Sequence, residues 1–242
     1  MLDSPPSAAA APARLDLLAR QHRTGGLALL GVALAGWMFL LWLALDMDTP
    51  IAQLAMPMSA RWSAANVAAV LAMWAVMMVA MMLPASWPML LTFSALARDR
   101  QGLGRALAFA AAYVLIWVGF AAAGTLGQWG MQALGWVDPI GAGTSVRINA
   151  ALLLLAGLYQ FTPLKRACLR TCRSPVAFLL GGWRSGTPGA FAMGLRHGML
   201  CLGCCWALMV LLFVGGVMNV AWVAALAIAV ATEKLVPAGE RV

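Results

Sequence analysis

The stretch RHGMLCLGCCWALM, residues 196 to 209, determines how the rest of the chain is interpreted. It lies inside an apolar run from residue 190 to residue 214, and it holds three of the five cysteines and one of the two histidines. A run of this length predicts a membrane-spanning helix. Residues four, seven and eight positions apart share one face of a helix, so we expect His197, Cys201, Cys204 and Cys205 along a single stripe.

The side chains of this stripe predict a soft-metal site. Thiolate and imidazole together suit Cu(I) or Zn(II), and we expect Cu(I) first. The alternative is packing, because cysteine is also a small apolar residue that fits where helices approach closely. His197 and Arg196 favour function, because ionisable groups at membrane depth are costly and usually functional.

The composition of the chain is that of an integral membrane protein. Of the 242 residues, 63% are hydrophobic and 10% are charged, whereas a soluble domain has about 25% charged residues. The net charge of +8 does not indicate a nucleic-acid partner, because the basic residues lie between apolar segments, as cytoplasmic anchors do. Five cysteines, an odd number, do not form a secreted disulfide framework.

Six apolar segments approach the length of about 20 residues that a spanning helix needs. They cover residues 27–45, 64–83, 107–126, 148–164, 190–214 and 217–236. We therefore predict an all-α membrane bundle of about six helices, with residues 1–26 as a disordered and basic juxtamembrane tail and residues 27–242 as one transmembrane domain. Pro84 is expected to kink the second span at its end, and only residues 215 and 216 separate the last two spans, which predicts a tight helical hairpin.

The positions of lysine and arginine predict the orientation of these spans. With the amino terminus in the cytoplasm, only Arg61 and Arg147 lie in outer loops, and Arg196 lies inside the fifth span. All other basic residues then lie on the inner side: Arg14, Arg20, Arg23, Arg98, Arg100, Arg105, Lys165, Arg166, Arg170, Arg173, Arg184, Lys234 and Arg241. An even number of spans agrees with both termini in the cytoplasm.

The second span carries a stripe of methionines. Met77, Met78, Met81 and Met82 follow Trp74 at helical spacing. Thioether sulfur is a soft ligand that selects Cu(I), although methionine also fills gaps in apolar cores. Because a second soft ligand set lies in the same bundle, we take Met77, Met78 and Met81 as candidate ligands and leave packing open as the alternative.

Cys168 and Cys172 lie one helical turn apart after the fourth span. The basic residues around them are expected to lower the pKa of both thiols and so to favour the metal-binding thiolate. In the cytosol these thiols would stay reduced. The alternative is an ordinary basic juxtamembrane segment that contacts anionic lipid.

Two further features limit the possible functions. Glu233 and Lys234 close the sixth span, where an interfacial ion pair is expected and a ligand or proton-relay role for Glu233 is the alternative. The sequence contains no phosphate-binding loop, no GxGxxG and neither of the hydrolase motifs HExxH and GxSxG. Nucleotide and hydrolase chemistry therefore have no support.

Several motifs together resemble a bacterial family of predicted metal-binding integral membrane proteins built on a domain of unknown function. These are AMMLP at 80–84, YQFTPLKRACLRTCRSP at 159–175, GLRHGMLCLGCCWALM at 194–209, GVMN at 216–219 and EK at 233–234. The resemblance covers about residues 64 to 237, and its two cysteine segments are the most specific part. It implies a multi-pass protein of the bacterial inner membrane with a metal site.

The sequence thus predicts a membrane protein that binds or translocates a soft transition metal, with Cys168 and Cys172 at the cytoplasmic mouth. A metallochaperone or another membrane protein is the expected partner. Two alternatives stay open. Cys201 and Cys204 have the CxxC spacing of a thiol–disulfide oxidoreductase, and the chain could instead be an assembly partner whose cysteines only pack.

Overall fold

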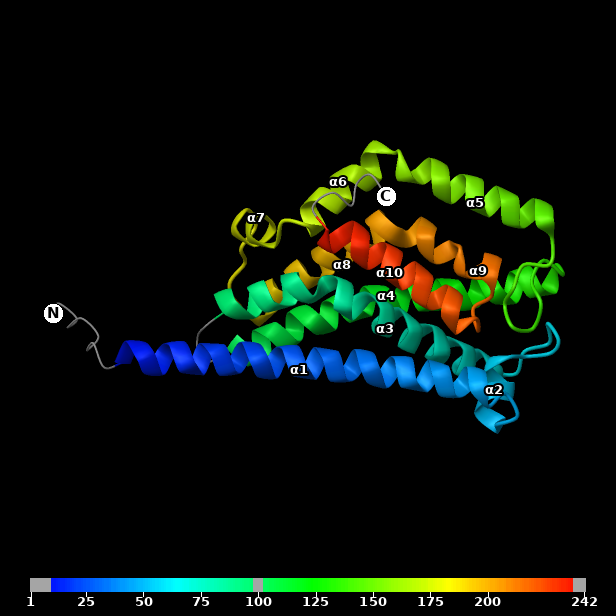
Figure 1. Cartoon of the computed structure of the whole chain (residues 1–242), viewed down its shortest axis with the longest axis horizontal. Coiled ribbons are helices and arrows are strands. Elements are labelled where there is room, and N and C mark those ends of the chain that lie inside the picture. The colour runs from blue at the N-terminus through cyan, green and yellow to red at the C-terminus, as the bar shows by residue number, and fades with distance from the viewer. Residues whose placement is uncertain (1–9, 98–101, 237–242) are drawn as a thin grey trace.

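The computed structural model describes residues 10–97 and 102–236, and in this part of the chain the fold is all-α, as predicted. The longer helices alternate in direction along the long axis of the molecule (Figure 1). The helices are α1 (Ala10–Leu45), α2 (Pro50–Ala55), α3 (Ala64–Leu96), α4 (Gly102–Ala133), α5 (Val146–Gln160), α6 (Pro163–Cys172), α7 (Pro175–Leu180), α8 (Gly186–Val210), α9 (Leu212–Gly215) and α10 (Val220–Leu235).

Four helical segments of the described chain are long and apolar enough to cross a membrane: Gly25–Leu45, Ala64–Leu96, Gly102–Ala133 and Gly186–Gly215. The other two predicted spans correspond to α5 and α10, which have 15 and 16 residues. At about 1.5 Å per residue they reach roughly 22 to 24 Å, less than the hydrocarbon core of about 30 Å. The six-span count and the orientation stay predictions.

A proline follows the end of α5, but the prolines within α3 do not end that helix. The predicted fourth span ends at Gln160 because Pro163 begins a separate helix, α6, capped by Thr162. The predicted end of the second span at residue 83 is wrong, because α3 continues through Pro84 and Pro88 to Leu96.

Side-chain hydroxyls support α3 around its prolines. Tyr113 of α4 donates to the Met82 carbonyl at 3.1 Å, and Ser86 donates to the Leu83 carbonyl at 3.1 Å. Tyr113 therefore joins α4 to α3 beside the site described below.

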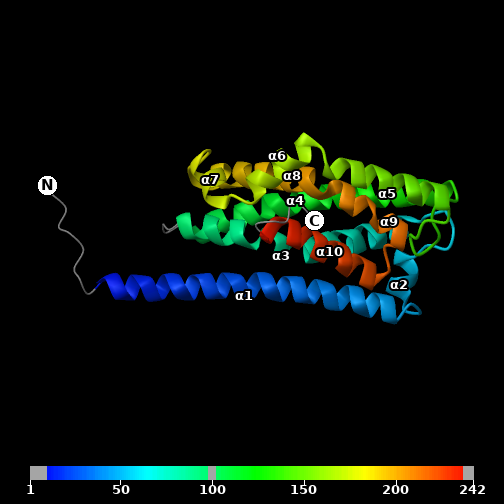
Figure 2. The same ribbon diagram turned by 45° about the horizontal axis from the view of Figure 1, so that its top comes forward.

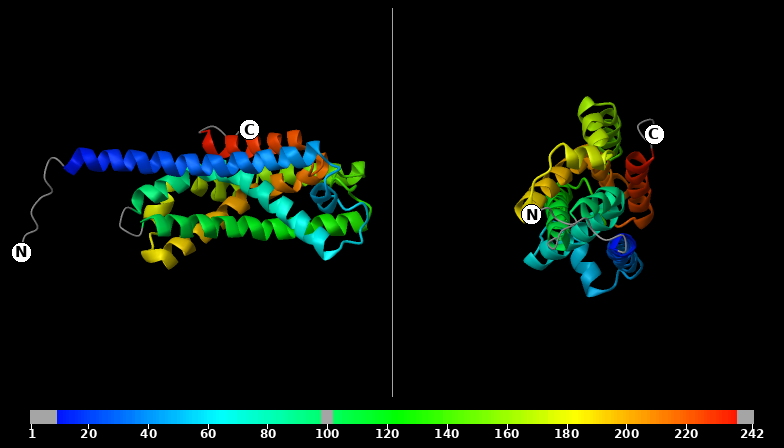
Figure 3. Two further views of the ribbon diagram at one scale, coloured as in Figure 1. Left: turned by 90° about the horizontal axis from the view of Figure 1, so that it is seen from below. Right: turned by 90° about the vertical axis from the view of Figure 1, so that its left-hand side faces the viewer.

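The amino-terminal prediction is only partly covered. Residues 1–9 lie outside the described chain, and so do Arg98, Arg100 and Arg241, which were assigned to the inner side. Residues 10–26, predicted as tail, are helical and form the beginning of α1. This helix lies along one outer side of the molecule, clear of α5 on the opposite side (Figures 2 and 3).

Helix α4 packs against both α3 and α8. Two glycines of α8 allow this close approach, which small residues provide in membrane bundles. A Cβ atom added at Gly194 would lie 2.3 Å from the Phe109 carbonyl oxygen, and one added at Gly198 would lie 2.8 Å from Ile116. Because these glycines flank His197, the same contact places the predicted stripe against α4.

The turn between α9 and α10 is tight but longer than predicted, because it takes residues 216–219 and not residues 215 and 216 alone. Gly216 has a φ of 94°, a conformation that glycine adopts without strain. The side chain of Asn219 then caps α10 by accepting from the backbone of Trp222 at 3.1 Å. The chain therefore turns sharply, and α10 packs against both α3 and α8.

Candidate metal site

The four residues of the predicted stripe all lie in α8 and are all buried. Their exposed fractions are 2% for His197 and 1% each for Cys201, Cys204 and Cys205. All five cysteines of the chain are free thiols. The stripe therefore faces the protein interior and not lipid.

Cys201 is the most highly connected of these thiols. Its Sγ lies 3.2 Å from the Tyr113 hydroxyl and accepts a hydrogen bond from Lys234 Nζ at 2.8 Å. The Cys204 and Cys205 thiols both donate to the Cys201 carbonyl at 3.0 Å. A buried ammonium group thus lies beside a sulfur atom, and two further thiols lie within one turn of it.

The two cysteines of α6 lie beside those of α8. Cys168 packs against Gly203, where an added Cβ would lie 2.9 Å from its Sγ. The Cys172 thiol is a hydrogen-bond partner of Cys204. Tyr159 also donates to the Gly203 carbonyl and packs edge-on against Trp206, which holds the end of α5 on α8. Two sets of cysteines that are more than 28 residues apart in the sequence thus form one group. We call this group the thiol cluster: Cys168, Cys172, Cys201, Cys204 and Cys205.

The predicted lowering of the α6 thiol pKa values is wrong. Burial, with a smaller contribution from Cys204, raises the pKa of Cys168. The hydrogen bond with Cys204, followed by burial, raises the pKa of Cys172 well above the ordinary value. The neighbouring cations have other partners, since Lys165 pairs with Glu233 and Arg166 donates to the Phe161 carbonyl.

Lys165 and Glu233 form a buried ion pair that the sequence did not reveal. The atoms Lys165 Nζ and Glu233 Oε1 are 2.6 Å apart, and Lys165 also donates to Gln160. The pair joins α6 to α10, so Glu233 is not the interfacial partner of Lys234. The local sequence contains no signal for this pair, because helix packing determines which carboxylate Lys165 contacts.

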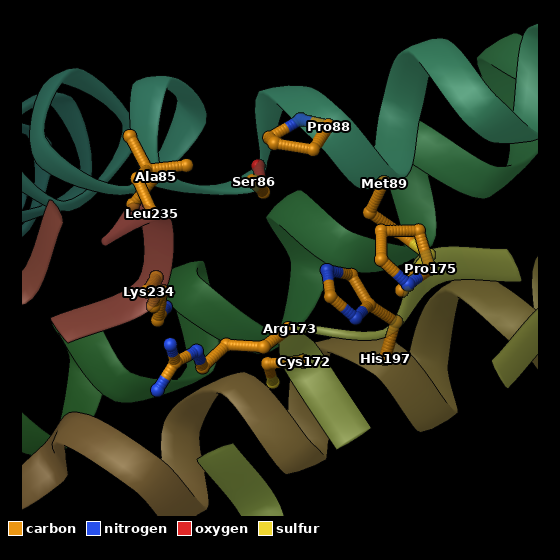
Figure 4. Close-up of a pocket in the computed structure, with 10 residues that line it drawn as sticks. All are labelled: Ala85, Ser86, Pro88, Met89, Cys172, Arg173, Pro175, His197, Lys234 and Leu235. Atoms are coloured by element: carbon orange, nitrogen blue, oxygen red, sulfur yellow. The ribbon is translucent and has the colours of Figure 1, made fainter. Parts of the chain in front are cut away.

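His197 lies among three aromatic rings. Its ring centroid is 5.3 Å from Tyr113, 6.0 Å from Phe109 and 5.8 Å from Phe178. In the described chain neither ring nitrogen has a hydrogen-bond partner. His197 also lines a cavity of about 220 Å³, together with Ser86, Met89, Cys172, Arg173 and Lys234 (Figure 4).

The predicted methionine ligands are buried in α3, with exposed fractions of 0% for Met77 and Met78 and 2% for Met81. The described contact from α3 to the thiol cluster instead runs through the Met82 carbonyl and Tyr113 to Cys201. A ligand role for these three methionines stays a prediction.

Within residues 10–97 and 102–236, no three His, Cys, Asp or Glu side chains are already arranged around one point as metal ligands. The hydrogen bonds explain why, because Cys204 and Cys205 point their thiols at a carbonyl and Cys201 accepts from Lys234. Binding a metal here requires these thiols to turn away from their present partners.

Four long apolar helices suggest a multi-pass membrane protein, and four of its five free thiols are buried. Residues 71–242 match the family model PpoB2, described as a copper chaperone, and the chain belongs to this family. The match covers nearly the same residues as the resemblance seen in the sequence and adds copper to it. No curated protein and no solved structure matches the chain.

Proposed function

We propose that this protein carries Cu(I) as cargo, bound within the helical bundle by the thiol cluster. The observation that supports this proposal best is the convergence of α6 and α8, which puts Cys172 in hydrogen-bond contact with Cys204 and Cys168 against Gly203. Soft thiolate ligands select Cu(I) over harder cations. Membership of a copper chaperone family points to the same cargo.

The ligands proposed for the cargo are Cys201 and Cys204 with Cys172 next to them, while Cys168 and Cys205 extend the cluster. A coordinating thiol loses its proton, so Cu(I) between two thiolates carries one negative charge. Lys234 Nζ, 2.8 Å from Cys201 Sγ, supplies the opposite charge. A buried charge is tolerated when it is paired, and we assign Lys234 the role of counter-ion of the loaded site.

The proposed path of the cargo runs between this cluster and the cytoplasm. With both termini and the α6–α7 region on the cytoplasmic side of the inner membrane, Cys172 is the thiol nearest to that side. A soluble metallochaperone or a membrane protein that needs copper is the proposed partner. His197, Met77, Met78 and Met81 remain proposed ligands at other points of the bundle, and Zn(II) remains the alternative metal.

The test is an anaerobic Cu(I) titration of the full chain in detergent, with a chromophoric chelator as competitor. Wild type should take Cu(I) from the chelator, and Cys204→Ala should lose this tight binding. The matched control is Leu202→Ala, a change in the same helix that removes no sulfur, and it should bind like wild type. Equal binding by wild type and Cys204→Ala would refute the proposal. A parallel Zn(II) titration decides between the two metals.

One observation favours a second candidate, a thiol–disulfide oxidoreductase. Cys172 and Cys204 come from different helices, and their thiols are in hydrogen-bond contact. Such an enzyme would form a disulfide here and pass two electrons to a membrane quinone. Thiol oxidation that depends on quinone, with no Cu(I) binding in the titration above, would favour this candidate over the carrier.

A further inference from the structure

The imidazole of His197 is the most conspicuous unpaired polar group near the site. It is 2% exposed, and neither Nδ1 nor Nε2 has a hydrogen-bond partner in the described chain. Leaving a buried donor or acceptor unpaired costs about 1–3 kcal/mol. The three rings around His197 hold its plane but satisfy neither nitrogen. A ligand that contacts one of these nitrogens would remove this cost.

The cavity that His197 lines brings together three kinds of soft or borderline ligand. His197 comes from α8, Met89 from α3, and Cys172 is the last residue of α6. In Figure 4 the His197 ring projects into the space between the α3 side chains and Cys172. An imidazole, a thioether and a thiol therefore border one cavity.

We propose that this cavity is a second Cu(I) subsite, held by His197, Met89 and Cys172. The inference rests on the proposed function, since it assumes Cu(I) as cargo. Met89 was not among the methionines selected from the sequence, which all precede Pro84, although it follows Met82 by seven residues and so lies on the same helical face. Cys172 borders the cavity and is also hydrogen-bonded to Cys204, so the subsite adjoins the thiol cluster.

The charges around the cavity are compatible with this cargo. Lys234 and Arg173 also line it, but Lys234 donates to Cys201 at 2.8 Å and Arg173 donates to the Val236 carbonyl at 2.6 Å. When Cys172 loses its proton, one thiolate balances one Cu(I), and the imidazole and thioether are neutral. The loaded subsite then carries no net charge, which suits a low-dielectric interior.

Water is the competing occupant, and the experiment has to separate it from Cu(I). A cavity of about 220 Å³ has room for several waters at about 30 Å³ each. Water would satisfy the His197 nitrogens but would not depend on the sulfur of Met89. The replacement Met89→Leu keeps the volume nearly constant and removes only the thioether, which makes it the decisive variant.

The experiment adds one equivalent of Cu(I) to the full chain in detergent under anaerobic conditions. The background is Cys204→Ala, which weakens the thiol cluster and leaves all three subsite ligands in place. Copper-edge X-ray absorption should show a nitrogen neighbour that disappears in Cys204→Ala/His197→Phe. Adding Met89→Leu should weaken Cu(I) binding at least about tenfold, while Met73→Leu, another buried methionine of α3, should leave it unchanged.

The outcomes distinguish the subsite from the function on which it rests. If wild type binds no Cu(I), the proposed function fails. If wild type binds Cu(I) but the Cys204→Ala background shows only sulfur neighbours, or Met89→Leu binds like its parent, the subsite is refuted and the carrier function stands. Equal losses in Met89→Leu and Met73→Leu would also refute the subsite, because they would report packing.

Discussion

At the scale of single residues, the adjacent side chains of Glu233 and Lys234 bind different partners. Lys234 donates to Cys201 on α8, and Glu233 pairs with Lys165 on α6. Both side chains are mostly buried, at 9% and 8% exposure, so each charge depends on a specific partner. The last turn of α10 therefore contributes to the site as directly as the cysteine helices do.

Replacing Lys234 should weaken Cu(I) binding, because the loaded bis-thiolate site loses its counter-ion. Removing one partner of a buried, hydrogen-bonded charge pair costs about 2–5 kcal/mol. We therefore expect Lys234→Met to raise the Cu(I) dissociation constant at least about tenfold. Lys234→Arg should retain most of the affinity, and the chelator competition measures both.

The control for this prediction is Arg166→Met, which removes a positive charge from the same region without touching a cysteine. Arg166 donates to the Phe161 carbonyl, and its loss should leave the affinity at the wild-type value. If Lys234→Met binds Cu(I) as tightly as wild type, the charge assignment is wrong.

At the scale of helices, the site depends on how closely α4 and α8 approach. Gly194 and Gly198 remove the side chains that would keep these helices apart, and Tyr113 of α4 then reaches both Cys201 on α8 and the Met82 carbonyl on α3. Tyr113 thus connects three helices at one point, and the spacing of the helices decides whether that contact forms.

The change Gly194→Ala should destabilise the protein. Its new Cβ would lie 2.3 Å from a backbone carbonyl of α4, and overpacking of this kind typically costs about 1–3 kcal/mol. Thermal unfolding in detergent should show a lower midpoint. Gly119→Ala on α4 faces open space and should leave the midpoint unchanged or slightly higher, since alanine favours helix. Similar midpoints for both variants would contradict the close contact.

Apolar periodicity predicted the long helices and the shared face of the cysteine stripe, because both depend on local sequence. It failed at Pro84, where α3 continues as a helix to Leu96. The convergence of α6 on α8 and the partners of Lys165 and Lys234 depend on packing between distant segments. The sequence also could not predict that Met89 lines the same cavity as His197, since only the folded chain brings the two together.

At the scale of the whole molecule, the segments predicted to be basic and cytoplasmic gather at one end. The described start of α1, the end of α3 and the α6–α7 region lie toward the same end in Figure 1. Cys172, as the last residue of α6, belongs to this region. In the proposed orientation, a cytoplasmic partner would exchange cargo at this end of the bundle.

Thiol labelling tests this orientation. A membrane-impermeant maleimide should label Cys172 in inverted vesicles and not in right-side-out vesicles. Cys168 should react more slowly, because it is 7% exposed whereas Cys172 is half-buried. The Cys172→Ser variant gives the background, and equal labelling in both vesicle types would contradict the cytoplasmic assignment.

The place of Glu233 and Lys234 in the chain has a consequence for biosynthesis. Translation runs from the amino terminus, so all five cysteines are made before Lys234, whose ammonium lies beside Cys201. Until Glu233 and Lys234 are made, Lys165 has no carboxylate and Cys201 has no ammonium beside it. These contacts of Lys165 and Cys201 are therefore among the last that the growing chain can complete.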